Sequence, residues 1–438
     1  MIYSKRVLDP VIVRAFHDSF ITGILGPRRV GKSTLIEHFF KEHAGLEVVH
    51  FNMDSMDERE AIKSGQLEAL ILTRIRRHFT QNKCVWVTID EAQKCPELFD
   101  QVKMLYDRYK DKGAIKFIIT GSALLELHRL SAESLAGRIQ LYHLSAFGLS
   151  EAHEKLFNTN LQTGLFDLIE SEAGEEKWQQ YFYNLTPYSH QLKETLLCLQ
   201  AWGGLPEVLA LDNDDARLNY LANYLQTYLE KDVRAIKTIT DLPLYRQIMQ
   251  IIAEQTGSVR DDDRILSVLR CHRETLNKYR RYMRATLMFD DIHPYINSSL
   301  KRLVKSPKGY LINNGLISYL QGIHDIDILI KTGQIGHRFE NWFLNELMIW
   351  LNKTAGNHEI FYWRTSGGAE VDFVVKKAPH VYPFEITFGK NIEQRKVRNL
   401  MRFRESEPKV GFSFYIYMGE FKYDANKKII FIPAWAVC

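Results

Sequence analysis

Near the N-terminus the sequence reads Gly26-Pro27-Arg28-Arg29-Val30-Gly31-Lys32-Ser33-Thr34. An apolar run at 20–25 precedes this stretch, and apolar residues at helical spacing follow it up to residue 40. The loop is therefore expected to join a buried strand to a helix. In that context G-x-x-x-x-G-K-[ST] is typical of a phosphate-binding loop, because its glycines let backbone N–H groups turn toward phosphate oxygens at a helix N-terminus. We predict that residues 26–34 bind ATP, with Lys32 on the β- and γ-phosphates and Ser33 on Mg²⁺.

A second apolar run, residues 84–89, ends directly in Asp90 and Glu91. A carboxylate at the C-terminal end of a strand can hold Mg²⁺, and the next one can polarise the attacking water. We assign Asp90, with Ser33, to the metal and Glu91 to the general base. An Asp-Glu pair alone is more often a solvated loop, but the phosphate loop upstream favours ATP hydrolysis here.

Apolar segments near 21–25, 47–51, 85–89 and 115–120 alternate with helical stretches, and a possible fifth lies at 139–143. Such alternation predicts an α/β fold with a parallel sheet and its ligand at the carboxyl edge of the strands. Thr120 or Ser122, at the end of the segment 115–120, could orient the catalytic water.

The composition is that of an ordinary folded protein. The chain has 438 residues, 45% of them apolar and 25% charged, which predicts two to four domains with real cores. A net charge of +4 is too mild to indicate a nucleic-acid or membrane partner by itself. The scattered cysteines form no zinc or disulfide pattern, and no apolar stretch resembles a signal peptide or a membrane span. We expect a cytoplasmic protein without a membrane partner.

Several segments together resemble the prokaryotic AAA-type ATPases that couple a P-loop core to a C-terminal domain of unassigned function. They are the phosphate loop, Ile89-Asp90-Glu91-Ala92-Gln93, Thr120-Gly121-Ser122, Ser134-Leu135-Ala136-Gly137-Arg138, Gly203-Gly204-Leu205-Pro206-Glu207, Tyr228-Leu229-Glu230-Lys231-Asp232-Val233 and 301–308. The resemblance implies that Arg138 reaches the γ-phosphate of a neighbouring subunit in a homo-oligomer. An arginine at a helix end that pairs with a carboxylate is an equally weighted alternative.

We predict an AAA-type ATPase core at 1–150, a helical lid at 151–241, a winged helix at 242–309 and a last domain at 310–438. Helical segments at 244–254, 264–269 and 273–284 suggest a winged helix-turn-helix whose last helix is the recognition helix. Basic residues there and just beyond would suit phosphate contacts: Arg273, Lys278, Arg280, Arg281, Arg284, Lys301, Arg302, Lys305 and Lys308. A solvated helix face, or docking on the nucleotide domain, is as good an explanation.

The C-terminal segment resembles the restriction-endonuclease-like fold, with a helix from 336 to 350, strands at 358–364, 369–375 and 381–387, a helix at 391–404, and strands at 411–418 and 428–432. Glu340, Asp372 and Glu385 match three acidic metal-binding positions of that fold and could hold Mg²⁺. Thr387 stands where the motif carries a lysine, although Lys376 or Lys390 could substitute for it. We therefore favour an inactive or weakened nuclease-like domain that serves as a binding module.

The combined prediction is an ATP-driven switch or motor whose winged-helix and nuclease-like domains bind DNA or a protein partner. Two alternatives stay open. One is an ATP-gated DNA nuclease, which the acidic residues support and Thr387 weakens. The other is a slow nucleotide-dependent regulator in which hydrolysis acts as a timer.

Overall fold

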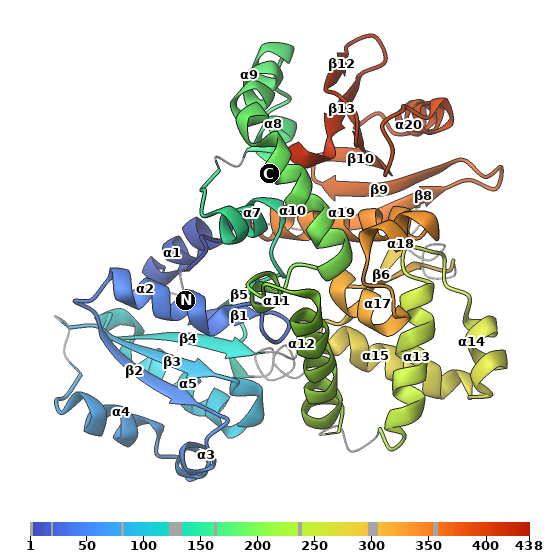
Figure 1. Cartoon of the computed structure of the whole chain (residues 1–438). Coiled ribbons are helices and arrows are strands. Elements are labelled where there is room, and N and C mark those ends of the chain that lie inside the picture. Colours follow the sequence, from blue (N-terminus) through green and yellow to red (C-terminus); the bar gives the residue numbers. More distant parts are fainter. Residues whose placement is uncertain are drawn as a thin grey trace. The chain divides into compact units, whose positions relative to one another are not determined.

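The computed structural model describes residues 3–18, 21–79, 83–121, 134–161, 164–234, 239–296, 305–353 and 358–438. The chain divides into two compact units. The first unit comprises Met1–Ser145 with Arg284–Leu287, and the second comprises Ala146–Met283 with Met288–Cys438. In Figure 1 the first unit is mostly blue and the second runs from green to red.

The first unit is built on a parallel sheet with the strand order β2-β3-β4-β1-β5. Because all these strands run the same way, their carboxyl ends meet at one edge. This arrangement confirms the predicted parallel α/β sheet. The strands are β1 (Ile21–Leu25), β2 (Glu47–Asn52), β3 (Val85–Asp90), β4 (Ile115–Gly121) and β5 (Ile139–His143).

Helices cover both faces of this sheet, because side chains on a strand alternate between the two faces. Trp86 of β3 packs against Phe16 and Phe39 on one face, whereas its neighbour Val87 lies in the core that Leu98 helps to form on the other. The first face carries α1 (Asp9–His17) and α2 (Lys32–Glu42), and the second carries α3 (Met56–Lys63), α4 (Leu67–Ile75) and α5 (Glu97–Tyr109). Short helices η1 (Ala92–Lys94) and η2 (Lys110–Lys112) flank α5.

The second unit starts with a long series of helices, and a large sheet follows them in the chain. Its helices up to residue 285 are α7 (Leu149–Phe157), α8 (Leu165–Glu170), α9 (Glu175–Leu185), η3 (Thr186–Tyr188), α10 (Ser189–Trp202), α11 (Pro206–Leu209), α12 (Asp214–Thr227), the π-helix η4 (Tyr228–Val233), α13 (Leu242–Glu254), α14 (Asp262–Leu269) and α15 (Arg273–Ala285). Later helices are α17 (Asn314–Gln321), α18 (Ile326–Lys331), α19 (Ile335–Asn352), α20 (Gln394–Ser406) and η5 (Ala434–Ala436).

The sheet of the second unit has the order β12-β13-β11-β10-β9-β8-β6-β7. Its strands are β6 (Phe289–Pro294), β7 (Lys308–Leu311), β8 (His358–Arg364), β9 (Glu370–Lys377), β10 (His380–Thr387), β11 (Ser413–Tyr417), β12 (Lys422–Asp424) and β13 (Ile429–Pro433). The antiparallel pair β6 and β7 joins the C-terminal strands because β6 runs parallel to β8. The predicted domain boundary between residues 309 and 310 therefore falls inside β7.

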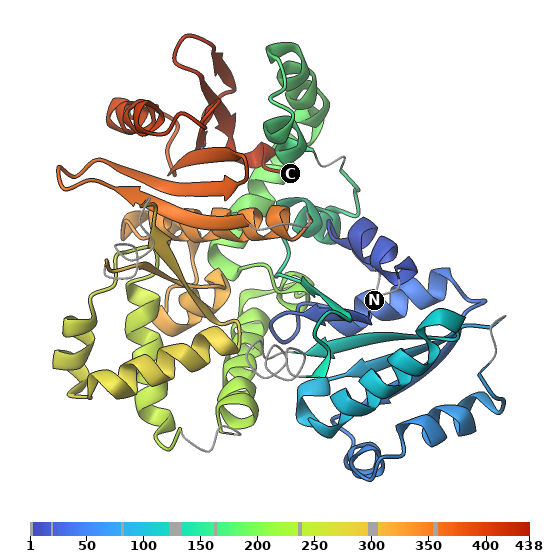
Figure 2. The same cartoon turned by 180° about the vertical axis from the view of Figure 1, so that it is seen from behind.

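One hydrophobic core joins helices α7–α10 to the C-terminal sheet. Trp178 and Leu192 from the helices lie in the same buried cluster as Trp350 of α19 and Phe384 and Phe414 of the strands. Helix α20 packs a separate cluster on the opposite face of the sheet, as Figure 2 shows from behind. Helices α7–α10, which lie mostly within the predicted lid, thus share a core with the C-terminal strands. No helix in the described ranges is long and apolar enough to cross a membrane.

A buried carboxyl group fixes the start of α7 within this core. Glu346 of α19 is 5% exposed, and its Oε1 accepts a hydrogen bond of 2.7 Å from the backbone N–H of Leu149. A side chain at Gly148 would collide with Glu346, since a Cβ there would lie 2.7 Å from Oε2. Burial raises the pKa of Glu346 to about 8.

We predict that Glu346→Gln flattens the dependence of stability on pH. The ordinary pKa of a glutamate is 4.5, and the pKa of Glu346 in the folded protein is about 8. Between these two pH values the carboxyl is ionised in the unfolded chain but protonated in the folded one. The contribution of Glu346 to the free energy of unfolding is therefore fully present at low pH. It is lost as the pH rises, by at most about 1.4 kcal/mol per pH unit. Glutamine keeps the acceptor for Leu149 without the titration.

Thermal unfolding from pH 5 to pH 8 measures this effect. The variant should exceed the wild type in melting temperature at pH 8, with the gap closing toward pH 5. Glu405→Gln, on the exposed surface of α20, is the matched control and should follow the wild type. Equal slopes in Glu346→Gln and the wild type would show that Glu346 does not titrate as described.

Candidate active site

The phosphate loop joins β1 to α2, as predicted, and packs tightly against the chain that follows β5. Gly31 has a φ of +96° at the start of α2, and Arg29 has a φ of +64°. A Cβ at Gly26 would lie 2.3 Å from the carbonyl oxygen of Leu144. Glycine at position 26 is thus required by close backbone approach and glycine at 31 by conformation.

Lys32 is buried at 6% exposure, and its ammonium lies against its own loop. Its Nζ donates hydrogen bonds of 2.9 Å to the carbonyl oxygens of Gly26 and Pro27. These contacts hold a positive charge on the inner side of the loop. The charge is therefore in place for a phosphate group that the loop would enclose.

The two predicted Mg²⁺ ligands lie in direct contact. Ser33 Oγ, in the first turn of α2, donates a hydrogen bond of 2.8 Å to Oδ2 of Asp90 at the end of β3. The Thr120 hydroxyl at the end of β4 donates to the other carboxylate oxygen, Oδ1. Hydroxyl and carboxylate oxygens are the ligands that Mg²⁺ prefers, so these residues fit a nucleotide-bound Mg²⁺.

Glu91 follows Asp90 at the same edge of the sheet. Its backbone has a φ of +53°, which is uncommon for a residue other than glycine. Gln93 Nε2 donates a hydrogen bond of 2.6 Å to Glu91 Oε2. The side chain of the predicted base is therefore held by an amide two residues further on. The predicted residue Ser122 lies outside the described residues.

Arg138 forms a two-pronged ion pair within its own unit. Its Nε and Nη2 donate to the two carboxylate oxygens of Asp107 on α5 at 2.8 and 2.9 Å. These hydrogen bonds lower the pKa of the exposed Asp107 carboxyl. The contact is the carboxylate pairing that the sequence left open for Arg138.

Arg6 supports the phosphate loop, a role that the sequence did not predict. Its side chain is buried, with Nη1 donating to the carbonyl of Val30 and Nη2 to that of Ser145, both at 2.7 Å. The guanidinium thus ties the loop to the chain beyond β5. A single arginine near the N-terminus carries no motif, so no local signal indicated this role.

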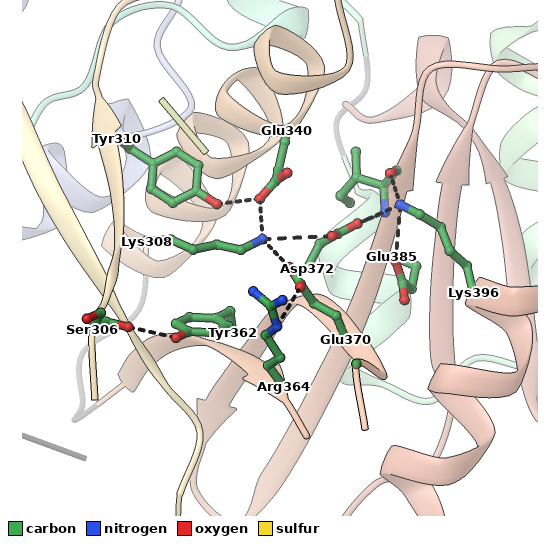
Figure 3. Close-up of polar contacts among 12 residues, drawn as sticks. Ser306, Lys308, Tyr310, Glu340, Tyr362, Arg364, Glu370, Asp372, Glu385 and Lys396 are labelled. Atoms are coloured by element: carbon green, nitrogen blue, oxygen red, sulfur yellow. Dashed lines mark hydrogen bonds and ion pairs between the residues drawn. The ribbon is translucent and has the colours of Figure 1, made fainter. Parts of the chain in front are cut away.

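The predicted acidic residues of the C-terminal domain do converge, but around two lysines, of which Lys308 is buried and Lys396 is partly exposed (Figure 3). Lys308 Nζ lies 2.7 Å from Glu370, 3.0 Å from Glu340 and 4.0 Å from Asp372. Burial alone would lower the pKa of Lys308, but Glu340, Asp372 and Glu370 raise it above its ordinary value. Lys308 is therefore an internal cation, and its prediction as a DNA contact is wrong.

A second lysine, Lys396 of α20, lies on the other side of Asp372. Its Nζ is 2.9 Å from Asp372 Oδ2 and 3.2 Å from Glu385 Oε2, and it donates to the carbonyl of Ile386 at 2.6 Å. Burial, together with the neighbouring Asp372, raises the pKa of Glu385 well above its ordinary value. Among the described residues no such ion pair is formed by Lys376 or Lys390, which the sequence offered instead.

These residues do not fit the metal that the resemblance implies. Within the described ranges, no group of three His, Cys, Asp or Glu side chains could hold a metal ion. The acids predicted as ligands, Glu340, Asp372 and Glu385, each have a lysine ammonium as partner instead. The described cluster is held together by lysine ammonium groups.

The basic residues of the predicted recognition helix divide between core and surface. Arg280 is buried at 3% exposure and pairs with Asp262 of α14 at 2.9 Å, so its prediction as a phosphate contact is wrong. Arg260 pairs with the same Asp262 and with Asp291. Arg273, Asn277 and Arg281 are exposed, one turn apart on α15. Lys301 and Arg302 lie outside the described residues.

Comparison with known proteins agrees with this geometry in the first unit. Residues 18–153 match the family described as an AAA domain, whereas residues 193–327 and 335–437 match families described only as domains of unknown function. The AAA match includes the phosphate loop, Asp90 and Arg138. The first unit has an AAA-type P-loop fold.

Two mycobacterial relatives span nearly the whole chain. Uncharacterized proteins of Mycobacterium tuberculosis and Mycobacterium bovis are each 24% identical over 434 residues, covering 99% of this chain and 84% of theirs. Among solved structures, the Walker-type ATPase of Pyrococcus abyssi gives a TM-score of 0.47 at 16% identity, covering 73% of this chain and 96% of that one. The ORC2 protein of Aeropyrum pernix in its ADP form gives 0.34 at 11% identity, covering 81% and 96%.

We predict that Gly26→Ala weakens nucleotide binding about tenfold or more, because the added methyl group must displace the loop from the Leu144 carbonyl, at about 1–3 kcal/mol. Equilibrium titration with a fluorescent ATP analogue measures the affinity. Gly45→Ala is the control, since its Cβ would meet nothing within 4 Å. If Gly26→Ala folds and binds as tightly as Gly45→Ala, the loop does not enclose the nucleotide.

Proposed function

We propose that this protein binds ATP with Mg²⁺ at residues 26–34 and hydrolyses it. The contact between Ser33 and Asp90, 2.8 Å long, carries the proposal. It brings together a hydroxyl from the phosphate loop and a carboxylate from another strand, which are the two protein ligands of Mg²⁺ in P-loop ATPases. Lys32 precedes Ser33 on α2, and Glu91 directly follows Asp90 at the end of β3.

Each residue of the site has a distinct task in this proposal. The Gly26–Gly31 backbone and Lys32 would hold the phosphates, and Ser33 and Asp90 would hold Mg²⁺. When bound, Mg²⁺ neutralises negative charge on the phosphate oxygens. Thr120 keeps the Asp90 carboxylate oriented through its hydrogen bond. Glu91 would accept a proton from the attacking water.

Gln93 holds one carboxylate oxygen of the proposed base, Glu91. Its Oε2 accepts from Gln93 at 2.6 Å, and a carboxylate bound to an amide is a poorer acceptor for a water proton. Exchange of this partner would be one step that limits turnover. This arrangement supports an ATPase that works as a switch, and it also suits the slow regulatory alternative.

We predict that Glu91→Gln lowers steady-state ATP turnover about 100-fold or more, in line with the loss of a general base, while ATP still binds. Phosphate release and equilibrium ATP binding are the two measurements. Glu60→Gln, an exposed residue of α3, is the matched control. Unchanged turnover in Glu91→Gln would remove Glu91 as the base, and Lys32→Ala would separately test the phosphate contact.

We propose that Arg138 acts on the nucleotide of a neighbouring subunit in a homo-oligomer. The guanidinium is bound to Asp107 at 2.8 and 2.9 Å on a partly exposed surface. Arg138 would have to exchange this carboxylate for the γ-phosphate of a neighbouring subunit. Both partners bind the planar guanidinium in the same two-pronged way, so such an exchange is chemically reasonable.

For the output of the ATPase we propose duplex DNA contact by the region around α15. Helices α13, α14 and α15 are followed by the antiparallel strands β6 and β7, which is the element order of a winged helix. Arg273, Asn277 and Arg281 are exposed along one side of α15. Arg273 is paired with Asp263 at 2.6 Å, whereas Arg281 forms no ion pair in the described part of the chain.

We predict that Arg281→Ala weakens duplex binding at all sequences and lowers the slope of log affinity against log salt by about 1, because one phosphate contact is lost. Fluorescence anisotropy at several salt concentrations gives both quantities. Arg246→Ala, exposed on α13, removes the same charge elsewhere and serves as the control. If both variants bind DNA alike, α15 is not the contact surface, and a protein partner becomes the better output.

The alternative of an ATP-gated nuclease is not favoured by the C-terminal cluster. Lys396 supplies an ammonium near Asp372 and Glu385 that the motif lacks at Thr387. However, Lys308 and Lys396 engage the carboxylates that would have to hold a metal. We therefore propose that this domain binds rather than cuts.

A further inference from the structure

The acidic cluster of the second unit brings carboxylates from separate elements to one point. Glu340 comes from α19, and Glu370 and Asp372 come from β9. Lys308 enters from β7, which precedes all of these elements in the chain (Figure 3). Its Nζ lies 2.7 Å from Glu370, 3.0 Å from Glu340 and 4.0 Å from Asp372. The point where the three carboxylates meet is thus taken by an ammonium.

Lys308 is not a surface lysine that has folded inward. Its side chain is 4% exposed, and lysine is almost never buried to this extent without charged partners. The Tyr362 ring lies 5.7 Å from its ammonium, and the hydroxyl of Tyr310, on the same strand, donates to Glu340. Both Lys308 and Glu340 therefore have further neighbours that fix their positions.

The carboxylates of this cluster are already paired with cations, so little negative charge is left to bind a metal ion. Lys308 and Lys396 both face Asp372, and Arg364 Nε lies 3.7 Å from Glu370. Divalent cations such as Mg²⁺ require oxygen ligands at about 2.0–2.6 Å. An ion at the meeting point would have to displace Lys308, and a buried ammonium without its carboxylates is strongly unfavourable.

We propose that the Lys308 ammonium is a built-in substitute for a divalent cation, which holds Glu340, Glu370 and Asp372 together and makes the C-terminal sheet independent of metal. The cluster is then a charged link between β7, α19 and β9. In this state the domain keeps the acidic positions of a nuclease-like site without its metal.

The proposal predicts that removing the ammonium creates a metal site. Lys308→Met keeps the length and apolar stem of the side chain but leaves three carboxylates facing one another. We expect it to bind one Mn²⁺ at least tenfold more tightly than the wild type, and Mn²⁺ to raise its melting temperature. Electron paramagnetic resonance of free Mn²⁺ measures binding, without nucleotide and in a Ser33→Ala background so that the phosphate loop does not contribute.

Matched variants make this experiment decisive. Lys305→Met removes an exposed lysine three residues away and should behave as the wild type. Adding Asp372→Asn to Lys308→Met should abolish the new site. If Lys308→Met fails to fold, Lys308→Met with Glu370→Gln carries one fewer unpaired charge and keeps Glu340 and Asp372 as ligands.

Two results would overturn the proposal. One is a Mn²⁺ site in the protein with Lys308 intact that disappears in Asp372→Asn, because the ammonium would then not exclude the metal. The other is a folded variant lacking Lys308, single or double, that binds Mn²⁺ no better than its parent. Because these measurements use protein without nucleotide, they are independent of the ATPase proposal.

Discussion

A cation buried in a protein must find its partners there, and this constraint organises both units of the chain. Lys32 and Arg6 meet backbone carbonyls around the phosphate loop, whereas Lys308 and Lys396 meet carboxylates. Carboxylates that surround a cation neutralise its charge within the fold.

The first unit was largely predictable because its signals are local. The segments that form β1 to β5 lie within a residue of their predicted limits. The central strands β1, β3 and β4 are buried on both faces and are therefore nearly continuous apolar segments. Because parallel strands end at the same edge of the sheet, their order in the sequence is enough to bring Asp90 and Thr120 close to Ser33, which follows β1. Arg6 could not be found in this way, because its partners are backbone carbonyls far away in the sequence.

The second unit shows where sequence patterns stop being informative. The strands and helices beyond residue 335 follow their predicted order closely, yet two basic residues before them, Arg280 and Lys308, are buried. Arg280 and Lys308 were read as surface cations because their neighbours are basic. Whether a basic residue faces water depends on distant carboxylates, here Asp262 and Glu340, and no local pattern records that pairing.

The pairing of β6 with β8 joins segments from both sides of the predicted domain boundary. Residues before and after position 310 supply neighbouring strands of one sheet, and α7–α10 share its core. A division of the chain at that position would cut β7 in two. The segments on either side of residue 310 therefore complete one sheet and one core together, and neither segment contains the whole of them.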